Sequence, residues 1–456
     1  MLTKYGQHSQ FDPNFTDPVT GRRGGIAHSG QALASRDLNN FQPRLGLAYR
    51  INDKMAFRGG FGMTTVDLQA AGLDQNFEEY FTAVTLQPPP GDPRPAFFIN
   101  QGPGVVRFNI QPNGTSPFVG VNYAGRTATW YDTKMRMPYV MNWNGTYQYQ
   151  FANEWLLELS YQGAGGVKLL EGWNVNQVPL NVSTDTNTLN QIFQSYQNFR
   201  PWNHFGNVNL WSNSGHNTFH SGTLKVEKRL SRGFTLNTFY TWSKALNSGD
   251  NDAILSGVDV YNRSLEKGRA GYDVRHRFVT YATYDLPFGR GKKWMNSNRA
   301  LDWVLGGWTM AGNPARFLPT GTVVRPNVRA SNYDGIKVDN WSIGPNRFAA
   351  NPMWDINAFA YPAAYTSGTM GRNVVEGPGL VWTQGSLAKV VNFGERYHLD
   401  IRFDINNIFK RPNFANPNAA ANITNPGTFG RPTGTIGGFC CLGGQFVGNL
   451  GLRFWF

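Results

Sequence analysis

The feature that most limits the fold of this chain is a strict alternation of apolar and polar residues along several short segments. Between residues 397 and 406 every odd position is apolar and every even position is polar. Successive side chains of a β-strand point to opposite faces of a sheet, so this period of two predicts a strand whose two faces meet different surroundings. The same period runs through residues 141–151, 155–161 and 224–230. The chain is therefore predicted to consist of two-faced strands.

About eleven strands can be placed, and the links between them follow a second regularity, because short and long links alternate. The predicted strands cover residues 43–50, 54–63, 139–151, 154–163, 217–230, 234–244, 275–287, 301–324, 380–391, 397–409 and 446–456. The short links are 51–53, 152–153, 231–233, 288–300 and 392–396, and the long links are 64–138, 164–216, 245–274, 325–379 and 410–445.

This sorting of the links predicts the architecture. In an up-and-down antiparallel sheet every second link lies at the same end, so all short links share one end and all long links share the other. Strands of about ten residues with short periplasmic turns and long extracellular loops are typical of outer-membrane barrels. A soluble β-sandwich also has two-faced strands, but long structureless links count against a compact soluble domain. The predicted fold class is all-β, an antiparallel up-and-down transmembrane β-barrel.

Composition excludes a helical membrane protein and favours an interface with lipid. No run approaches the roughly 18 apolar residues that a membrane-spanning helix needs. Charged residues make up only 16% of the chain, where about 25% is usual. Aromatic residues amount to 14 Trp, 19 Tyr and 32 Phe, and several lie near strand ends, where an amphipathic ring suits the headgroup level. These are Trp143, Trp155, Tyr161, Trp242, Tyr284 and Trp308, although a core role is the alternative for each.

Two strands supply the candidate site residues. In the strand at 397–409 the predicted lipid-facing residues are Leu399, Ile401, Phe403 and Ile405. The chain ends on a strand with Leu450, Leu452, Phe454 and Phe456 on one face. An apolar edge strand at a free terminus invites aggregation in a soluble protein. This ending resembles the C-terminal targeting strand that the barrel-assembly machinery reads by edge pairing.

Several stretches, kept in order, resemble the barrel of Oar-like TonB-dependent receptors of the outer membrane. They include NNFQPRLGLAYRINDKMAFRGGFGM at 39–63, FHSGTLKVEKRLSRGFTLNTFYTWSKALN at 219–247 and YDVRHRFVTYATYDLPFGRGKKW at 272–294. Two more are LGGWTMAGNPARFLPTGTVV at 305–324 and LDIRFDINNIFKRPNFANPN at 399–418. The similarity extends from about Phe11 to Phe456.

The resemblance implies a barrel of about 22 strands filled by an N-terminal plug. About eleven strands would be half of it. We therefore expect residues 1–42 to be a loop or linker from a preceding barrel strand, and residues 43–456 to be the C-terminal half of the barrel. No plug motif or TonB-box segment maps onto this sequence, and MLTKYGQHSQFDPNF at the N-terminus lacks the apolar core of a signal peptide. The expectation is a piece of a longer protein.

The predicted function is ligand uptake or binding through extracellular loops in the cell outer membrane of a Gram-negative bacterium. The expected partners are outer-membrane lipid, the barrel-assembly machinery, TonB through an N-terminal region that this chain lacks, and a ligand that could be a glycan, a peptide or a chelate. A surface binding or adhesion scaffold without transport is the main alternative. A soluble secreted β-protein such as a lectin is a third.

We expect this chain to have no enzymatic activity and to bind no cofactor. No GxGxxG, Walker, GxSxG or HExxH pattern occurs. The formal net charge is +13, but basic residues are spread singly, which disfavours nucleic acid as a partner. We also expect no bound metal. A loop metal site at His204, His216 and His220, or a calcium loop at Asp250 and Asp252, is the less favoured interpretation.

The only cysteines are the neighbours Cys440 and Cys441. Two free thiols are favoured over a strained vicinal disulfide, and the sequence does not decide their state.

Overall fold

The computed structural model describes residues 9–16, 21–28, 37–66, 127–179, 195–250, 259–289, 292–295, 307–319, 327–328, 352–360, 369–394, 396–418, 429–432, 434–436 and 446–456. Within these residues the regular structure is β-strand with three short 3-10 turns at Tyr196–Phe199, Arg263–Glu266 and Ile356–Ala358. No helix in this part of the chain is long and apolar enough to cross a membrane. The predicted all-β class is confirmed.

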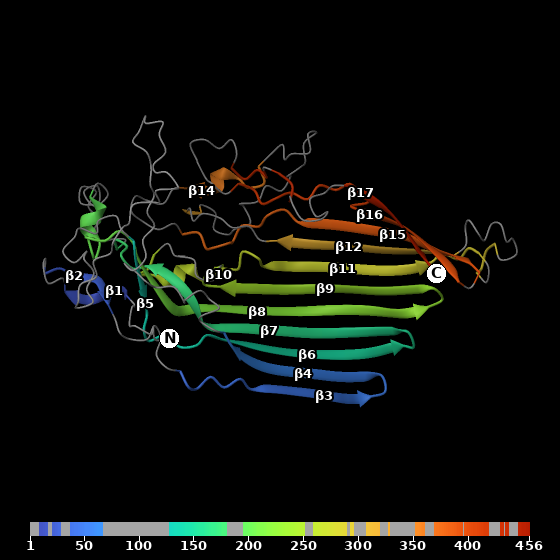
Figure 1. Cartoon of the computed structure of the whole chain (residues 1–456), viewed down its shortest axis with the longest axis horizontal. Helices are drawn as coiled ribbons and strands as arrows, with labels where there is room; N and C mark the ends of the chain where they lie inside the picture. The colour runs from blue at the N-terminus through green and yellow to red at the C-terminus, as the bar shows by residue number, and fades with distance from the viewer. Residues whose placement is uncertain are drawn as a thin grey trace, which may run out of the picture.

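One antiparallel meander dominates the molecule. A 13-stranded sheet contains two short strands off its main path, β5 (Ala128–Tyr131) and β10 (Gly268–Arg269), which leaves eleven strands in the order β17-β16-β15-β12-β11-β9-β8-β7-β6-β4-β3. Figure 1 shows these strands side by side in chain order. Their bounds are β3 Arg44–Asn52, β4 Met55–Thr65, β6 Tyr139–Ala152, β7 Trp155–Asn174, β8 Val208–Ser231, β9 Phe234–Asn247, β11 Val274–Asp285, β12 Trp308–Pro319, β15 Leu380–Phe393, β16 Tyr397–Asn406 and β17 Val447–Trp455.

The strand ends that the short links join all lie at one end of the sheet, here called the turn end, and the strand ends that the long links join lie at the other, the loop end (Figure 1). Strands β8 and β9 are joined by Arg232 and Gly233, whose φ angles are 50° and 76°. Two residues with positive φ form the hairpin turn whose twist matches that of the strands. The predicted up-and-down order and the sorting of the links are confirmed.

Three strands differ most from the prediction. Strands β7 and β8 extend far beyond residues 163 and 217, so part of the predicted loop 164–216 is paired sheet. The glycines at 163, 165 and 166 broke the alternation and hid this extension. Gly163 is needed because a Cβ there would lie 2.3 Å from the indole ring of Trp143. The strand predicted at 301–324 is the shorter β12.

Two small apolar cores order parts of the loop end. A hairpin of β1 (Ser9–Thr16) and β2 (Arg23–His28) packs through Phe11 and Ile26 onto Ala128, Phe205 and Val208. The second core contains Trp354, Phe359 and Phe429 with Met353, Ala358, Met370 and Val375, next to the short strands β13 (Asn327–Val328) and β14 (Phe359–Ala360). The hairpin lies within residues 1–42, where the sequence suggested only a linker. The domain boundary at 42/43 stays a prediction.

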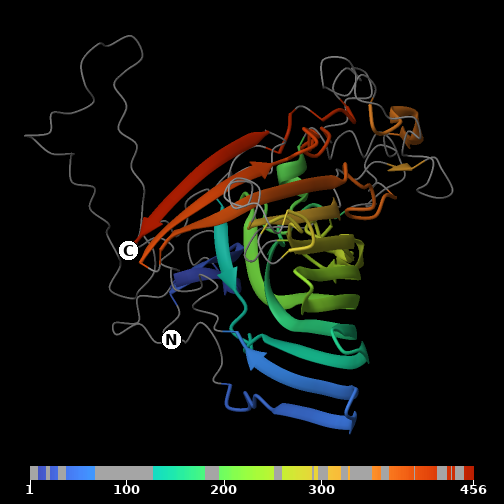
Figure 2. The same cartoon turned by 90° about the vertical axis from the view of Figure 1, so that its right-hand side faces the viewer.

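The main sheet is curved and open. Figure 2, which looks along the strands, shows β3 at one margin of the arc and β17 at the other. Within the described residues β3 pairs only with β4, and β17 pairs only with β16. Each outer strand therefore presents backbone groups that no strand of the described sheet pairs.

Candidate functional site

The register brings the predicted site residues into one apolar surface. Across β16 and β17 the directly opposite pairs are Leu399 with Phe454, Ile401 with Leu452, and Phe403 with Leu450, and Ile405 lies opposite Gly448. Opposite residues of an antiparallel pair share a face. Phe456 follows β17 and is 81% exposed, with its ring 6.3 Å from that of Phe454. Whether these residues meet lipid or the assembly machinery stays a prediction.

We call this surface the apolar face and the opposite one the polar face. The polar face of β16 and β17 carries Asp400 opposite Arg453, and Arg402 forms an ion pair of 2.9 Å with Asp404. The same pattern holds in mid-sheet, where Gln148 of β6 donates to Glu158 of β7 at 2.8 Å. Lys225 pairs with Glu227 on β8 at 2.8 Å. Charges on this face are thus held by neighbouring polar groups.

The six aromatic residues that the sequence predicted at the headgroup level all lie on the apolar face, as their strand pairings require. Trp155 lies opposite Lys228, Tyr284 opposite Phe234, and Trp308 opposite Lys389 near the turn end. Trp143, Tyr161 and Trp242 lie closer to the loop end, where Trp143 is opposite Gly163 and both Tyr161 and Trp242 are opposite Gly222. The aromatic residues form two separate rows.

Two lysines at the turn-end row lie against aromatic rings, and one of them also binds carbonyls of the adjacent turn. The Lys228 ammonium donates to the Ser231 carbonyl at 3.2 Å and to the Phe234 carbonyl at 3.1 Å, and lies over the Trp155 ring at 5.9 Å. Lys389 lies over the Trp308 ring at 5.6 Å. Such snorkelling places an apolar stem along lipid and the charge at the interface.

The spacing of the two rows suits a bilayer. On β8 the loop-end row reaches His220, eight residues from Lys228, which is about 27 Å along the strand. Since barrel strands are tilted by about 40°, this length corresponds to a height of about 21 Å, somewhat less than the apolar band of about 25 Å in such barrels. Strand β8 continues another twelve residues to Val208, so the loop end projects beyond the band.

A polar pocket lies at the loop end. It has a volume of about 560 Å³. Strand β1 contributes Gln10, Phe11, Asp12, Pro13 and Asn14 to its wall. The rest of the wall consists of Trp130 of β5, the following residues Asp132, Thr133 and Lys134, and Leu210 of β8. Gln10 Oε1 accepts from the Tyr131 N–H at 2.9 Å, which ties the hairpin to β5. Amide, carboxylate, ammonium and indole groups thus converge on one concavity.

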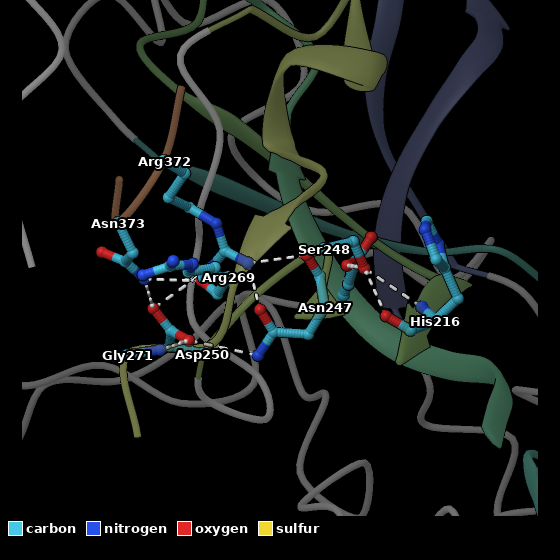
Figure 3. A network of polar contacts seen from close by, with 9 residues as sticks. His216, Asn247, Ser248, Asp250, Arg269, Gly271, Arg372 and Asn373 are labelled. Atoms are coloured by element: carbon cyan, nitrogen blue, oxygen red, sulfur yellow. Dashed lines mark hydrogen bonds and ion pairs between the residues drawn. The ribbon is translucent and has the colours of Figure 1, made fainter. Parts of the chain in front are cut away.

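A second loop-end feature is a network of polar contacts between segments far apart in sequence (Figure 3). Arg372, which precedes β15, forms an ion pair of 3.2 Å with Asp250 after β9 and donates to Asn247. Asn373 is fully buried and donates to Asp250 at 2.9 Å and to the Arg269 carbonyl at 2.8 Å. The Arg269 guanidinium contacts Glu376 at 3.0 Å. We call this set the loop-end network, and it joins the loop after β9 to the segment before β15.

Asp250 is the electrostatic centre of this network. Burial alone raises the pKa of its carboxyl, but hydrogen bonds from the Gly271 N–H, Asn247 and Asn373, together with the Arg372 charge, bring that pKa below its ordinary value. The ionised form is therefore the one that the fold stabilises. For buried Asp273 the balance is reversed, because desolvation raises its pKa more than the Ala245 N–H and nearby cations lower it.

The residues considered for metal binding lie in different places. His204 is buried with its Nε2 at 2.8 Å from the Gly24 carbonyl, whereas His220 contacts Tyr161 on the apolar face. His216 lies four residues along β8 from His220, or about 13 Å. Asp250 contacts arginine and asparagine rather than further carboxylates. Asp252, Cys440 and Cys441 lie outside the described residues.

Sequence reasoning missed the pocket and the loop-end network, because both join segments that only the folded chain brings together. Asp250 and Arg372 are 122 positions apart, and nothing in their local sequences links them. The Asn and Gln content of the loops was a signal of side chains suited to hydrogen bonding, but it did not indicate partners.

The chain was compared with known proteins. A family model described as outer membrane beta barrel domain matches residues 1–439. No curated protein sequence matches. Similar solved structures include the outer membrane transporter YddB from Escherichia coli, at 10% identity and a TM-score of 0.41, with 89% of this chain and 38% of that chain covered. The FrpB iron transporter from Neisseria meningitidis has 12% identity and a TM-score of 0.40, with 94% and 41% covered. The siderophore receptor PiuA from Acinetobacter baumannii has 9% identity and a TM-score of 0.39, with 91% and 35% covered.

This chain therefore spans less than half of each of these solved chains. The family match confirms the predicted fold class and the predicted location in the outer membrane of Gram-negative bacteria. Because the family model matches nearly the whole sequence, the chain belongs to the outer membrane beta barrel domain family.

Proposed function

We propose that this chain is the C-terminal part of an outer-membrane receptor barrel that captures a ligand at its loop end for uptake. The observation that carries the proposal is the eleven-strand meander with one apolar and one polar face. In a barrel the apolar face contacts lipid and the polar face lines the lumen. The loop end then faces outward, and the turn end faces the periplasm.

The open margins support the idea that further strands complete the barrel. Unpaired backbone groups cost several kcal/mol each in hydrocarbon, so β3 and β17 need partners within the membrane. Strands outside residues 43–456 would supply them, in a barrel of about 22 strands. The sequence resemblance to TonB-dependent receptors also supports coupling to TonB through a plug outside this chain.

The loop-end pocket is the proposed capture site. Its Trp130 ring offers a flat apolar surface, while Gln10, Asn14 and Asp12 offer donors and acceptors. Binding sites often combine an apolar wall with a few convergent polar groups. A glycan, a peptide and a chelate all remain candidate ligands. In each case the proposed role of the chain is binding and passage, without chemistry on the ligand.

Uptake into cells tests the proposal. A Gram-negative host expressing the complete gene is given three labelled probes, namely dextran oligosaccharides, a tryptic peptide pool and a ferric hydroxamate. We expect one class to accumulate above the level in the empty host, to lose accumulation when TonB is deleted, and to bind less well to Trp130→Ala. Surface binding without accumulation would indicate an adhesion scaffold instead, and neither binding nor accumulation would contradict the receptor proposal.

A further inference from the structure

A chain of hydrogen bonds crosses three strands on the apolar face at the loop-end row. The Trp143 Nε1–H of β6 donates to the Tyr161 hydroxyl of β7 at 3.4 Å, and that hydroxyl lies 2.7 Å from Nδ1 of His220 on β8. An indole N–H can only donate. Because the Tyr161 oxygen accepts from Trp143, its own proton is free to point to Nδ1 of His220. The neutral imidazole then carries its proton on Nε2, as a hydrogen-bond donor.

The arrangement is repeated two strands further on. The Tyr240 hydroxyl of β9 lies 2.7 Å from Nδ1 of His276 on β11, and the two rings are stacked with centroids 6.1 Å apart. The first pair stacks in the same way, with 6.2 Å between the Tyr161 and His220 centroids. Each histidine is therefore held by a tyrosine in a fixed orientation.

Lys244 of β9 lies between the two histidines. It is directly opposite His220, so their Cβ atoms are about 5 Å apart, and it is diagonal to His276, which lies opposite Trp242. Lys244 and His220 are exposed. The nearby carboxylate of Asp273 attracts Lys244, but Asp273 is buried and accepts from the Ala245 N–H at 2.7 Å.

The charge of the surrounding surface has one sign. Along the described barrel strands between the two aromatic rows, the carboxylates of Glu158, Glu227, Asp285, Asp400 and Asp404 are on the polar face. On β8, β9 and β11 the charged and imidazole side chains of the apolar face there belong to lysine and histidine. The register also places Arg316 of β12 on this face, opposite Phe278. Trp242, next to Lys244, is 63% exposed. An anionic group arriving from the membrane side thus meets donors and no like charge.

We propose that His220, Lys244 and His276 form a clasp for the phosphate of a membrane lipid at the loop-end boundary of the apolar band. The two imidazoles and the ammonium supply donors, and charge-assisted hydrogen bonds to phosphate are the stronger kind. The lipid chains lie along the apolar face below the clasp, beside Leu224 and Tyr240. Tyr161 and Tyr240 are positioning residues that hold the two imidazole rings in place. The clasp does not depend on ligand uptake.

Chemical protection of Lys244 tests the clasp. The complete protein, made from the whole gene, is folded into phosphatidylcholine vesicles with or without phosphatidic acid and treated with an amine-reactive reagent. Its Lys244 peptide is then quantified by mass spectrometry. We expect phosphatidic acid to slow modification of Lys244 roughly tenfold, the effect of one charge-assisted hydrogen bond. The His220→Ala variant should lose most of this protection, and Tyr161→Phe should lose part of it.

Lys228 is the matched control, since it lies on the same face and strand as His220 but its ammonium is already bound to Ser231 and Phe234. Its modification should change little. Equal protection of Lys244 by both vesicle types, or protection that persists in His220→Ala, would overturn the clasp. Unchanged protection in Tyr161→Phe would overturn the positioning role of Tyr161. Both lipids occupy both leaflets, so these outcomes are independent of membrane orientation and of uptake.

Discussion

Arginine at Leu159 should destabilise the barrel, whereas arginine at the next residue, Ser160, should be tolerated. Leu159 is on the apolar face between Leu224 and Tyr147 and is 48% exposed on that open face. It lies four residues, or about 13 Å along the strand, from Trp155 in the turn-end row. Ser160 points to the polar face between Thr146 and Thr223. The two positions share a depth and differ in the medium that they face.

The expected loss in the free energy of unfolding depends on how deep the arginine lies in the bilayer. An arginine on the lipid face near the bilayer midplane costs about 2 to 4 kcal/mol, and near an interface about 0 to 1 kcal/mol. Leu159 lies between the two aromatic rows, so Leu159→Arg should fall in the upper range. Ser160→Arg enters a surface that already carries Lys225 and Glu158, and its cost should stay within about 1 kcal/mol.

Urea titration of the two variants in the complete protein, made from the whole gene and refolded into phosphatidylcholine vesicles, measures the difference in the free energy of unfolding. The midpoint for Leu159→Arg should be clearly lower at an unchanged slope. Equal midpoints for the two variants, or a lower midpoint for Ser160→Arg, would refute the assignment of the apolar face to lipid.

Three further outcomes are expected. Ile401→Arg should lower the free energy of unfolding by about 2 kcal/mol while Asp400→Asn changes it little, which the same titration measures, and equal effects would contradict the predicted faces of β16. Because the pKa of Asp250 is lowered in the fold, its contribution to stability is full above the ordinary value of about 4 and is lost as the pH falls through the lower folded value. The protection of residues 369–376 from hydrogen exchange, taken relative to the intrinsic exchange rate at each pH, should therefore fall in acid and fall in Asp250→Asn at neutral pH. A loss of protection in acid that persists in Asp250→Asn would exclude this origin. The chain expressed alone should not migrate as a heat-modifiable monomer on a gel, because β3 and β17 each pair with a single strand in the described sheet, and such a band would show that it closes unaided.

The sequence predicted the strand meander because the two faces of each strand, one apolar and one polar, impose opposite demands on alternate residues. The pattern at Leu399, Ile401 and Phe403 placed these residues on one face without any knowledge of their neighbours, and the register with β17 agrees. The lengths of the links then ordered the strands. Both signals are local, so a single sequence contains them.

The sequence failed where contacts are long-range or where glycine hides a strand. The extension of β7 through Gly163 depends on the close approach of Trp143 from the neighbouring strand. The β1–β2 hairpin depends on Phe11 packing against Trp202 and Phe205, with ring centroids 4.8 Å and 5.1 Å away. Likewise, the sequence contains the carboxylate of Asp250 but does not indicate that Arg372 is its partner. Pairing across such distances requires the fold.

Cysteine labelling on intact cells tests the central claim, that the loop end lies outside an outer-membrane barrel, most directly. Cys440 and Cys441 are first replaced by serine, and single cysteines are introduced at Ser264 in the loop after β9 and at Asn153 in the turn between β6 and β7. A maleimide that cannot cross the membrane should label Ser264→Cys on intact cells, and Asn153→Cys only after the outer membrane is permeabilised. Labelling of Asn153→Cys but not of Ser264→Cys on intact cells would contradict the account.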